Sequence, residues 1–262
     1  MDNKIKFYRS ESQLMNDAVD RIVVEFHRRK KERGDKVFLL TGCSSEVGTT
    51  SVSINLAIAL SVAGWKTVLV DCDMRKNDKF KRLNEESKSG LVDYLEKSKA
   101  VNDIAYDTGY DNLEYIPCGT TTNISPVRLL CSGKMEKLVD ELKDKYDFVI
   151  FDFPSIDIVP DADILIPSID AVALVAAMRK TTKHQLAEAK LKMEIYEDKY
   201  AGLIINRVDM MQYRKYNHDY DYFRTDNQND KYEKNLKKKI KEQNKDHNKE
   251  KKINNKESKE EV

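Results

Sequence analysis

Three aspartates follow apolar runs of the sequence, and their spacing suggests a site for a metal ion and phosphate groups. Asp71 and Asp73 stand two residues apart in "VLVDCDMRK", on one face of an extended segment, and Asp152 ends "FVIFD". A carboxylate at the rim of an apolar sheet costs desolvation energy unless it is compensated, as Mg²⁺ and phosphate-bound water would do. A single aspartate commonly caps the next turn. Three of them beside one helix N-terminus are less common, so we interpret Asp71, Asp73 and Asp152 as parts of one site.

A loop that contains glycine follows another apolar run and has features of a phosphate-binding turn. "KVFLLTG" leads through "CSSEVG" into a helical pattern that opens on "TTS". Amides in the first turn of a helix have no intrahelical acceptor, and the helix dipole adds positive charge there, so anions bind well. The Thr50 hydroxyl would reach Mg²⁺. Taken alone, the loop favours an ordinary turn with a Thr or Ser cap, but the three aspartates shift the balance.

The segments that carry these residues alternate between apolar runs and helical patterns. This alternation predicts an α/β fold with a mostly parallel sheet covered by helices on both faces, and ligands at the carboxyl ends of the strands. The apolar runs predict strands over 36–42, 66–73, 113–119, 147–152, 170–177 and 201–208. The periodic segments predict helices over 12–30, 50–63, 90–98 and 181–197, and two pieces within 125–146 that break near 132–133.

Composition limits the remaining functions. The 262 residues carry a formal net charge of +1, which predicts no acidic partner such as nucleic acid. Four cysteines without a C-x-x-C pair or a histidine cluster favour a reducing cytoplasm over a metal site or a disulfide framework. No apolar run approaches the roughly 18 residues of a membrane span, and the N-terminus lacks the apolar core of a secretion signal. We therefore expect a cytoplasmic protein without direct membrane insertion.

The C-terminal part of the chain differs in composition from the rest. From Asp230 onward it is mostly Lys, Glu, Asn and Asp, which predicts a disordered, solvated tail. Five of the 13 tyrosines fall within residues 213–232, among charged and polar neighbours. We predict an N-terminal helical segment over 1–33, an α/β core domain over 34–209, a tyrosine-rich cluster over 210–232 and a charged tail over 233–262.

The motifs together resemble those of a known family. "SSEVGTTSVSINLAIALSVAGWKTVLVDCDMRK", "YDFVIFDFPS" and "GLIINRVD" are similar to bacterial tyrosine kinases of the capsular-polysaccharide type, which belong to the deviant-Walker P-loop ATPases. "IPCGTTTNISPVRLLCSGKMEKLV" resembles the family's stretch with Asn-Pro-x-Glu-Leu-Leu-x-Ser. The similarity covers roughly residues 10 to 215. It implies a three-layer P-loop NTPase fold with ATP and Mg²⁺ as cofactors.

The resemblance also implies roles for individual residues. Thr50 and Asp71 would lie near Mg²⁺, Asp152 would bind the metal through water, and Asp73 would be the base on a tyrosine hydroxyl. Asn206 would meet the adenine. The nucleotide-binding residues expected on these grounds are Ser45, Glu46, Val47, Gly48, Thr49, Thr50, Ser51, Arg75 and Asn206.

The same resemblance assigns a substrate and a partner. Members of the family carry a C-terminal tyrosine cluster that they phosphorylate in a neighbouring subunit. Their partner is a membrane polysaccharide copolymerase, which would recruit this chain to the inner face of the membrane and link it to capsular or exopolysaccharide synthesis and export. The expected phosphoacceptors are Tyr213, Tyr216, Tyr220, Tyr222 and Tyr232.

Two departures from the family pattern bear on activity. Thr49 stands where the family has its phosphate-binding lysine, and Glu46 replaces a glycine of the loop. Losing one such contact at the transition state typically costs roughly 10²–10³ in rate. Arg75, close to Asp73 in the sequence, or a neighbouring subunit would have to supply the charge. In the N-terminal helix, the family's Glu-x-x-Arg-x-x-Arg ring motif is reduced to Arg21.

Three functions follow from these observations. The first is an autophosphorylating tyrosine kinase, in a homo-oligomer if the ring forms. The second is a kinase-like, nucleotide-binding regulator with little catalysis, which the loop substitutions favour. The third is a partitioning-type ATPase that acts on DNA or membrane, and it is disfavoured because the tail has no amphipathic membrane helix and no basic face.

Overall fold

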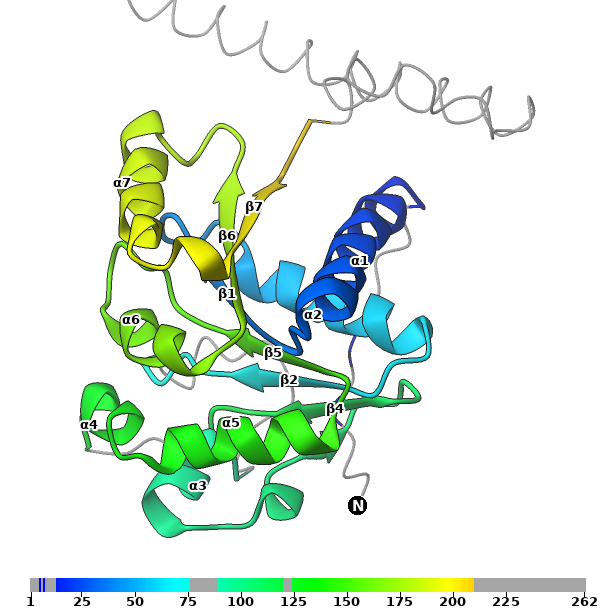
Figure 1. Ribbon diagram of the computed structural model, residues 1–262, viewed down its shortest axis with the longest axis vertical. Coiled ribbons are helices and arrows are strands. Elements are labelled where there is room, and N and C mark those ends of the chain that lie inside the picture. The colour runs from blue at the N-terminus through cyan, green and yellow to red at the C-terminus, as the bar shows by residue number, and fades with distance from the viewer. Residues whose placement is uncertain (1–4, 6, 8–12, 76–88, 120–123, 210–262) are drawn as a thin grey trace, which may run out of the picture. The chain divides into compact units, whose positions relative to one another are not determined.

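The computed structural model describes residues 5, 7, 13–75, 89–119 and 124–209 of the chain (Figure 1). The chain divides into two compact units, Met1–Val208 and Asp209–Val262. The predicted tyrosine cluster and charged tail at 210–262 lie outside the described residues, so those predictions and the domain boundaries stay predictions.

The described residues form one seven-stranded sheet, in the order β3-β4-β2-β5-β1-β6-β7. All neighbouring strands are parallel except β3 and β4. The six predicted strands are confirmed, and β3 is additional because its two residues are too short to give a pattern. The strands are β1 (Val37–Gly42), β2 (Thr67–Asp71), β3 (Tyr106–Asp107), β4 (Leu113–Ile116), β5 (Phe148–Asp152), β6 (Ala171–Ala177) and β7 (Tyr200–Asn206).

Helices cover both faces of the sheet, as predicted (Figure 1). The helices are α1 (Gln13–Arg33), α2 (Thr49–Val62), α3 (Leu91–Lys97), α4 (Pro126–Leu130), α5 (Lys134–Lys145), α6 (Asp161–Leu165) and α7 (Lys183–Glu194), with 3₁₀ turns at Val101–Asp103, Ile166–Ser168 and Glu197–Lys199. The predicted break between α4 and α5 is confirmed at Gly133, whose φ is 67°. The short helix α6 was not predicted, because five residues give no helical period.

Strand side chains alternate between two apolar cores. Phe38 and Leu40 of β1 pack with α1 and α2 on one face of the sheet. Val37 and Leu39 point to the other face, where α3, α4, α5, α6 and α7 lie. A strand buried on both faces must be apolar at every position, which is why these runs show no polar alternation.

The buried face of α1 combines three- and four-residue spacings. The structure buries Val19, Val23 and Phe26 and leaves Ala18 and Ile22 only partly covered. Phe26 stacks on Phe38 with ring centroids 4.0 Å apart. A spacing of four residues drifts around a helix of 3.6 residues per turn, so the contact follows a mixed three- and four-residue spacing.

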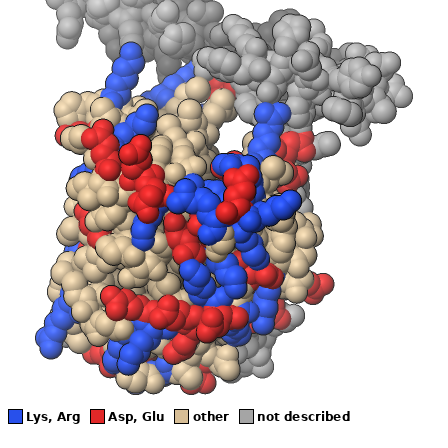
Figure 2. All heavy atoms as spheres, viewed as in Figure 1, with Lys and Arg blue, Asp and Glu red and all other residues tan. Residues whose placement is uncertain are grey.

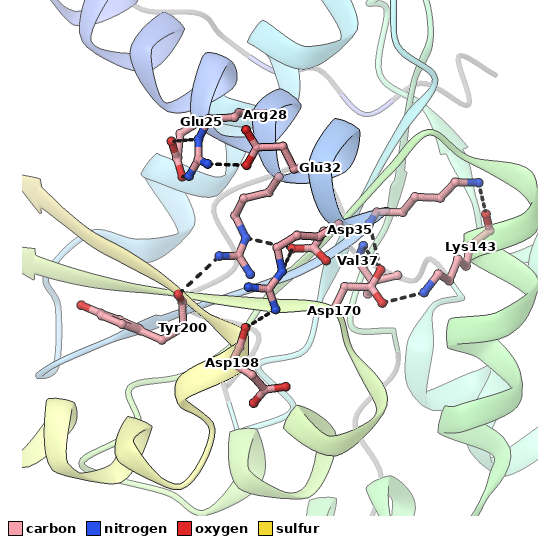
Figure 3. A network of polar contacts seen from close by, with 12 residues as sticks. Glu25, Arg28, Glu32, Asp35, Val37, Lys143, Asp170, Asp198 and Tyr200 are labelled. Atoms are coloured by element: carbon pink, nitrogen blue, oxygen red, sulfur yellow. Dashed lines mark hydrogen bonds and ion pairs between the residues drawn. The ribbon is translucent and has the colours of Figure 1, made fainter.

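A polar network fixes α1 to the amino ends of the central strands (Figure 3). The buried Arg29 donates its Nε to Asp35 Oδ2 at 2.9 Å. Asp170 accepts the amides of Lys36 and Val37 at 2.8 and 3.0 Å. Burial raises the pKa of Asp170. The hydrogen bonds from Lys143 and from these two amides together lower it by more than burial raises it, so the pKa is below its usual value. The network therefore anchors the end of the sheet opposite the loop that follows β1.

In the view of Figure 2, acidic and basic side chains are interleaved on the surface, without a large patch of a single charge. Among the residues that the structure describes, none of the helices has the length and apolar character needed to cross a membrane.

Candidate nucleotide site

The predicted site residues lie where three central strands end. Asp152 of β5 is the register partner of Asp71 in β2 and of Leu40 in β1. The loop over residues 43–48 continues from β1 into α2. The two acidic strand ends and the loop therefore meet at the carboxyl edge of the sheet, as the parallel arrangement predicts.

The N-terminus of α2 is open to a ligand. Its N-cap, Gly48, has φ 89° and ψ 30°, and no side chain caps the helix. The first intrahelical bond runs from the Val52 amide to the Gly48 carbonyl, at 3.0 Å. The amides of Gly48, Thr49 and Thr50 have no hydrogen-bond acceptor within the described part of the chain. The alternative of a turn closed by a Thr or Ser cap is therefore wrong, and these donors suit a phosphate group.

Two glycines let the loop approach its surroundings closely. A Cβ added to Gly48 would lie 2.5 Å from Asn206 Nδ2, and one added to Gly42 would lie 2.8 Å from Ser155 Oγ. Gly48 also has the left-handed backbone that disfavours other residues. The shape of the cradle thus depends on both positions.

Side chains from neighbouring strand ends hold the loop. Ser155 donates to the Ser44 carbonyl at 2.7 Å. Asn206 donates its Nδ2 to the Val47 carbonyl at 2.8 Å, and its Oδ1 accepts the Arg207 amide. Asn206 was expected to meet the adenine. The structure places it against the loop backbone, so its adenine contact stays a prediction.

An open cavity of about 310 Å³ joins the loop to the aspartates. It brings together most of the predicted loop residues with two of the predicted acids, Asp73 and Asp152. The cavity is lined by Ser45, Glu46, Val47, Gly48, Thr49, Thr50, Asp73, Asp152, Phe153, Pro154, Ser155 and Ile158.

Each of the three aspartates accepts a hydrogen bond from a neighbouring residue in the structure. Asp152 is 3% exposed, and its Oδ1 accepts the Ser53 hydroxyl at 3.1 Å. Asp71 is 9% exposed, is not among the lining residues, and accepts the Asp73 amide at 2.9 Å. Asp73 in turn accepts the Arg75 amide at 3.3 Å. Asp73 therefore lines the cavity, whereas Asp71 is held next to it by the Asp73 amide.

The donor set suits magnesium with phosphate more than a protein-only metal site. Within the described ranges there is no group of three His, Cys, Asp or Glu side chains that could hold a metal ion. Mg²⁺ commonly takes only one or two carboxylates and completes its shell with water and substrate phosphates. Thr50, Asp71 and Asp152 meet that requirement in type, and their metal role stays a prediction.

Arg75 does not replace the missing lysine in this structure. Its guanidinium makes two hydrogen bonds to Asp161, at 2.9 and 2.7 Å, and this contact raises the pKa of Arg75. Asp161 is 1% exposed, so removing its partner would leave a buried carboxylate uncompensated. Arg75 is also not among the residues that line the cavity. Its predicted contact with the nucleotide therefore has no support in this geometry.

Several residues at the site were not predicted. Ser53, one turn after Thr49, donates to both the Thr49 carbonyl and Asp152, and its helical spacing could have signalled this. Lys180 and Thr181, from the loop after β6, contact Glu46 and Ser44. Their place depends on the order of strands in the sheet, which no local pattern encodes.

Comparisons of the sequence agree with this geometry. A family model described as "AAA domain" (AAA_31) matches residues 43–179. The tyrosine-protein kinase CpsD of Streptococcus agalactiae is 30% identical over 178 residues, which is 67% of this chain and 76% of that protein.

Solved structures of a tyrosine kinase domain and of a MinD protein also resemble this chain. The BceF tyrosine kinase domain superposes with a TM-score of 0.66 at 26% identity, over 75% of this chain and 78% of that one. The septum site-determining protein MinD of Pyrococcus horikoshii, complexed with Mg-ADP, has a TM-score of 0.52 at 21% identity, over 69% and 76%, which shows a shared fold alone. The chain therefore belongs to the AAA-domain family and to the bacterial tyrosine-protein kinases, of which CpsD is a member.

Proposed function

We propose that this chain binds Mg²⁺-ATP and transfers a phosphoryl group to tyrosines of its own 213–232 segment. One observation carries the proposal: a single cavity joins the uncapped N-terminus of α2 to the carboxylates of Asp73 and Asp152. Family membership supports the same reaction, since the relatives are named tyrosine-protein kinases.

The residues have distinct tasks in this proposal. The amides of Gly48, Thr49 and Thr50 bind the phosphates. Asp71 and the Thr50 hydroxyl would hold the cation, and Asp152, which accepts a hydrogen bond from Ser53, would act through water. When bound, Mg²⁺ offsets the negative charge that develops on the transferred group. Asp73 accepts the proton of the tyrosine hydroxyl.

The resemblance to capsular kinases supports the wider setting. A membrane polysaccharide copolymerase would recruit the chain to the inner face of the membrane and couple it to capsular or exopolysaccharide synthesis and export. The retained ring arginine, Arg21, is exposed on α1 and is available to a second copy of the chain. Phosphorylation between subunits of a homo-oligomer would follow.

Tyrosine phosphorylation tests this proposal. The purified full chain, with ATP, Mg²⁺ and a partner fragment, is expected to gain phosphotyrosine that maps to Tyr213, Tyr216, Tyr220, Tyr222 or Tyr232. Replacing these five by Phe should abolish the signal, because the acceptor hydroxyls are gone. A Tyr196→Phe control should keep it. A protein that binds ATP yet gains no phosphotyrosine under any of these conditions would contradict the kinase role.

The charge of the cavity favours a second function, a nucleotide-binding regulator with little catalysis. Among its described lining residues, the charged ones are Glu46, Asp73 and Asp152, with no lysine or arginine. Carboxylates in the wall disfavour the build-up of negative charge on a phosphoryl group during its transfer.

A further inference from the structure

The acidic lining poses a problem for any triphosphate. P-loop enzymes place a lysine on the β- and γ-phosphates, and Thr49 occupies that position here. The described lining residues carry three carboxylates and no cationic side chain. A positive charge must therefore come from beyond the lining itself, and Arg75 is held by Asp161.

Lys180 is a cation in contact with the lining. Its Nζ lies 2.7 Å from Oε2 of Glu46, which is part of the cavity wall. Lys180 follows β6, the strand next to β1, so it approaches the phosphate-binding loop from the side opposite β5. The ammonium group thus stands at the edge of the cavity, close to the loop that would hold the phosphates.

The backbone around Lys180 is fixed against that loop. The Thr181 hydroxyl lies 3.2 Å from the Ser44 hydroxyl and accepts the Ala177 amide at 3.0 Å. Arg179 has a left-handed φ of 63°, which turns the chain sharply after β6. The contacts Ser44–Thr181 and Glu46–Lys180 therefore join the two loops, and the second one involves a charge.

The Glu46–Lys180 pair is easily exchanged, in contrast to Arg75–Asp161. The Glu46 side chain is 82% exposed and that of Lys180 34% exposed, and ion pairs of this kind add little stability. Asp161, by comparison, is buried and would lose its compensation. A lysine on a flexible stem can leave a hydrated carboxylate for a phosphate with more charge.

We infer that Lys180 supplies the positive charge for the nucleotide phosphates that Thr49 does not, and that Glu46 holds it at the cavity edge until the nucleotide binds. The inference rests on the proposed function, since it concerns the same site. Lys180 is thereby a phosphate-binding residue contributed by the loop after β6, outside the phosphate-binding loop.

Equilibrium titration of labelled ATP in Mg²⁺ tests the inference without measuring turnover. Lys180→Gln is expected to weaken ATP binding roughly tenfold or more, because one charged contact to phosphate is lost. Lys190→Ala, an exposed lysine on α7, serves as the matched control and should bind as the wild type does. Thermal melting confirms that the variants fold.

A double-variant cycle separates a direct contact from neutralisation of Glu46. In the Glu46→Gln background, Lys180→Gln is expected to weaken ATP binding at least as much as in the wild type. If the effect disappears in that background, or if Lys180→Gln binds ATP normally, the inference is wrong while the proposed function stands. If the wild type binds no ATP, the proposed function fails and the inference fails with it.

Discussion

The double variant Glu46→Gly with Thr49→Lys is expected to bind ATP more tightly than the wild type and to transfer phosphate roughly 10²–10³ times faster, because one charged transition-state contact is worth about that much. Thr49 opens α2 and lines the cavity, so a lysine there starts from the position that P-loops use. Glu46 has a left-handed φ of 53°, which glycine adopts without strain. Its removal also takes one carboxylate from the wall.

The two single variants show how much each substitution contributes to the gain in ATP affinity and in transfer rate. Thr49→Lys alone should raise the rate of phosphotyrosine formation, and Glu46→Gly alone should mainly strengthen ATP binding. Rates of phosphotyrosine formation and ATP affinities are measured side by side for all four proteins. A wild type that already matches the double variant in both quantities would refute the idea that the substituted loop limits activity, and would exclude the regulator function.

Asp73→Asn is expected to lower the rate of phosphotyrosine formation by about 10²–10⁴, the usual contribution of a general base. Asp73 lines the cavity, whereas Asp71 is not among the lining residues and accepts the Asp73 amide, so Asp73 is the carboxylate open to an incoming hydroxyl. Asparagine keeps the size and can still accept the Arg75 amide, so the turn should survive. ATP binding should therefore change little.

The measurement pairs a single-turnover phosphorylation assay with an ATP titration. Asp144→Asn, an exposed aspartate on α5, is the matched control and should behave as the wild type. Equal rates of phosphorylation by Asp73→Asn and the wild type would show that Asp73 is not the general base. A parallel loss of ATP binding would assign Asp73 to the nucleotide instead.

The main strands and the place of the site could be predicted from the sequence because the strands of a parallel sheet are continuous apolar runs, which are easy to recognise. Runs such as "FVIFD" are buried on both faces, and their acidic ends fall at one edge of the sheet. The face of α1 could not be predicted as well, since Val19, Val23 and Phe26 are chosen by contact with Phe38 and α2. Spacing alone does not identify that partner.

The ion pairs at the site could not be predicted from local sequence patterns, because their partners lie far apart in the sequence. Arg75 is two residues from Asp73, yet its guanidinium pairs with Asp161, far along the chain in α6. Lys180 is 134 residues from Glu46 and meets it because β6 lies beside β1. Nearness in sequence suggested that Arg75 contacts the nucleotide, which stays a prediction, and only the sheet order reveals the contact of Lys180 with Glu46.

The central claim is that the amides at the start of α2 and the rim aspartates form one site for magnesium and a triphosphate. Titration of labelled ATP against the purified wild type, in Mg²⁺ and in a chelator, tests it most directly. The account predicts saturable binding of one nucleotide per chain, tighter in Mg²⁺, with the magnesium effect reduced in Asp152→Asn. Binding that is absent, or identical with and without Mg²⁺, would contradict it.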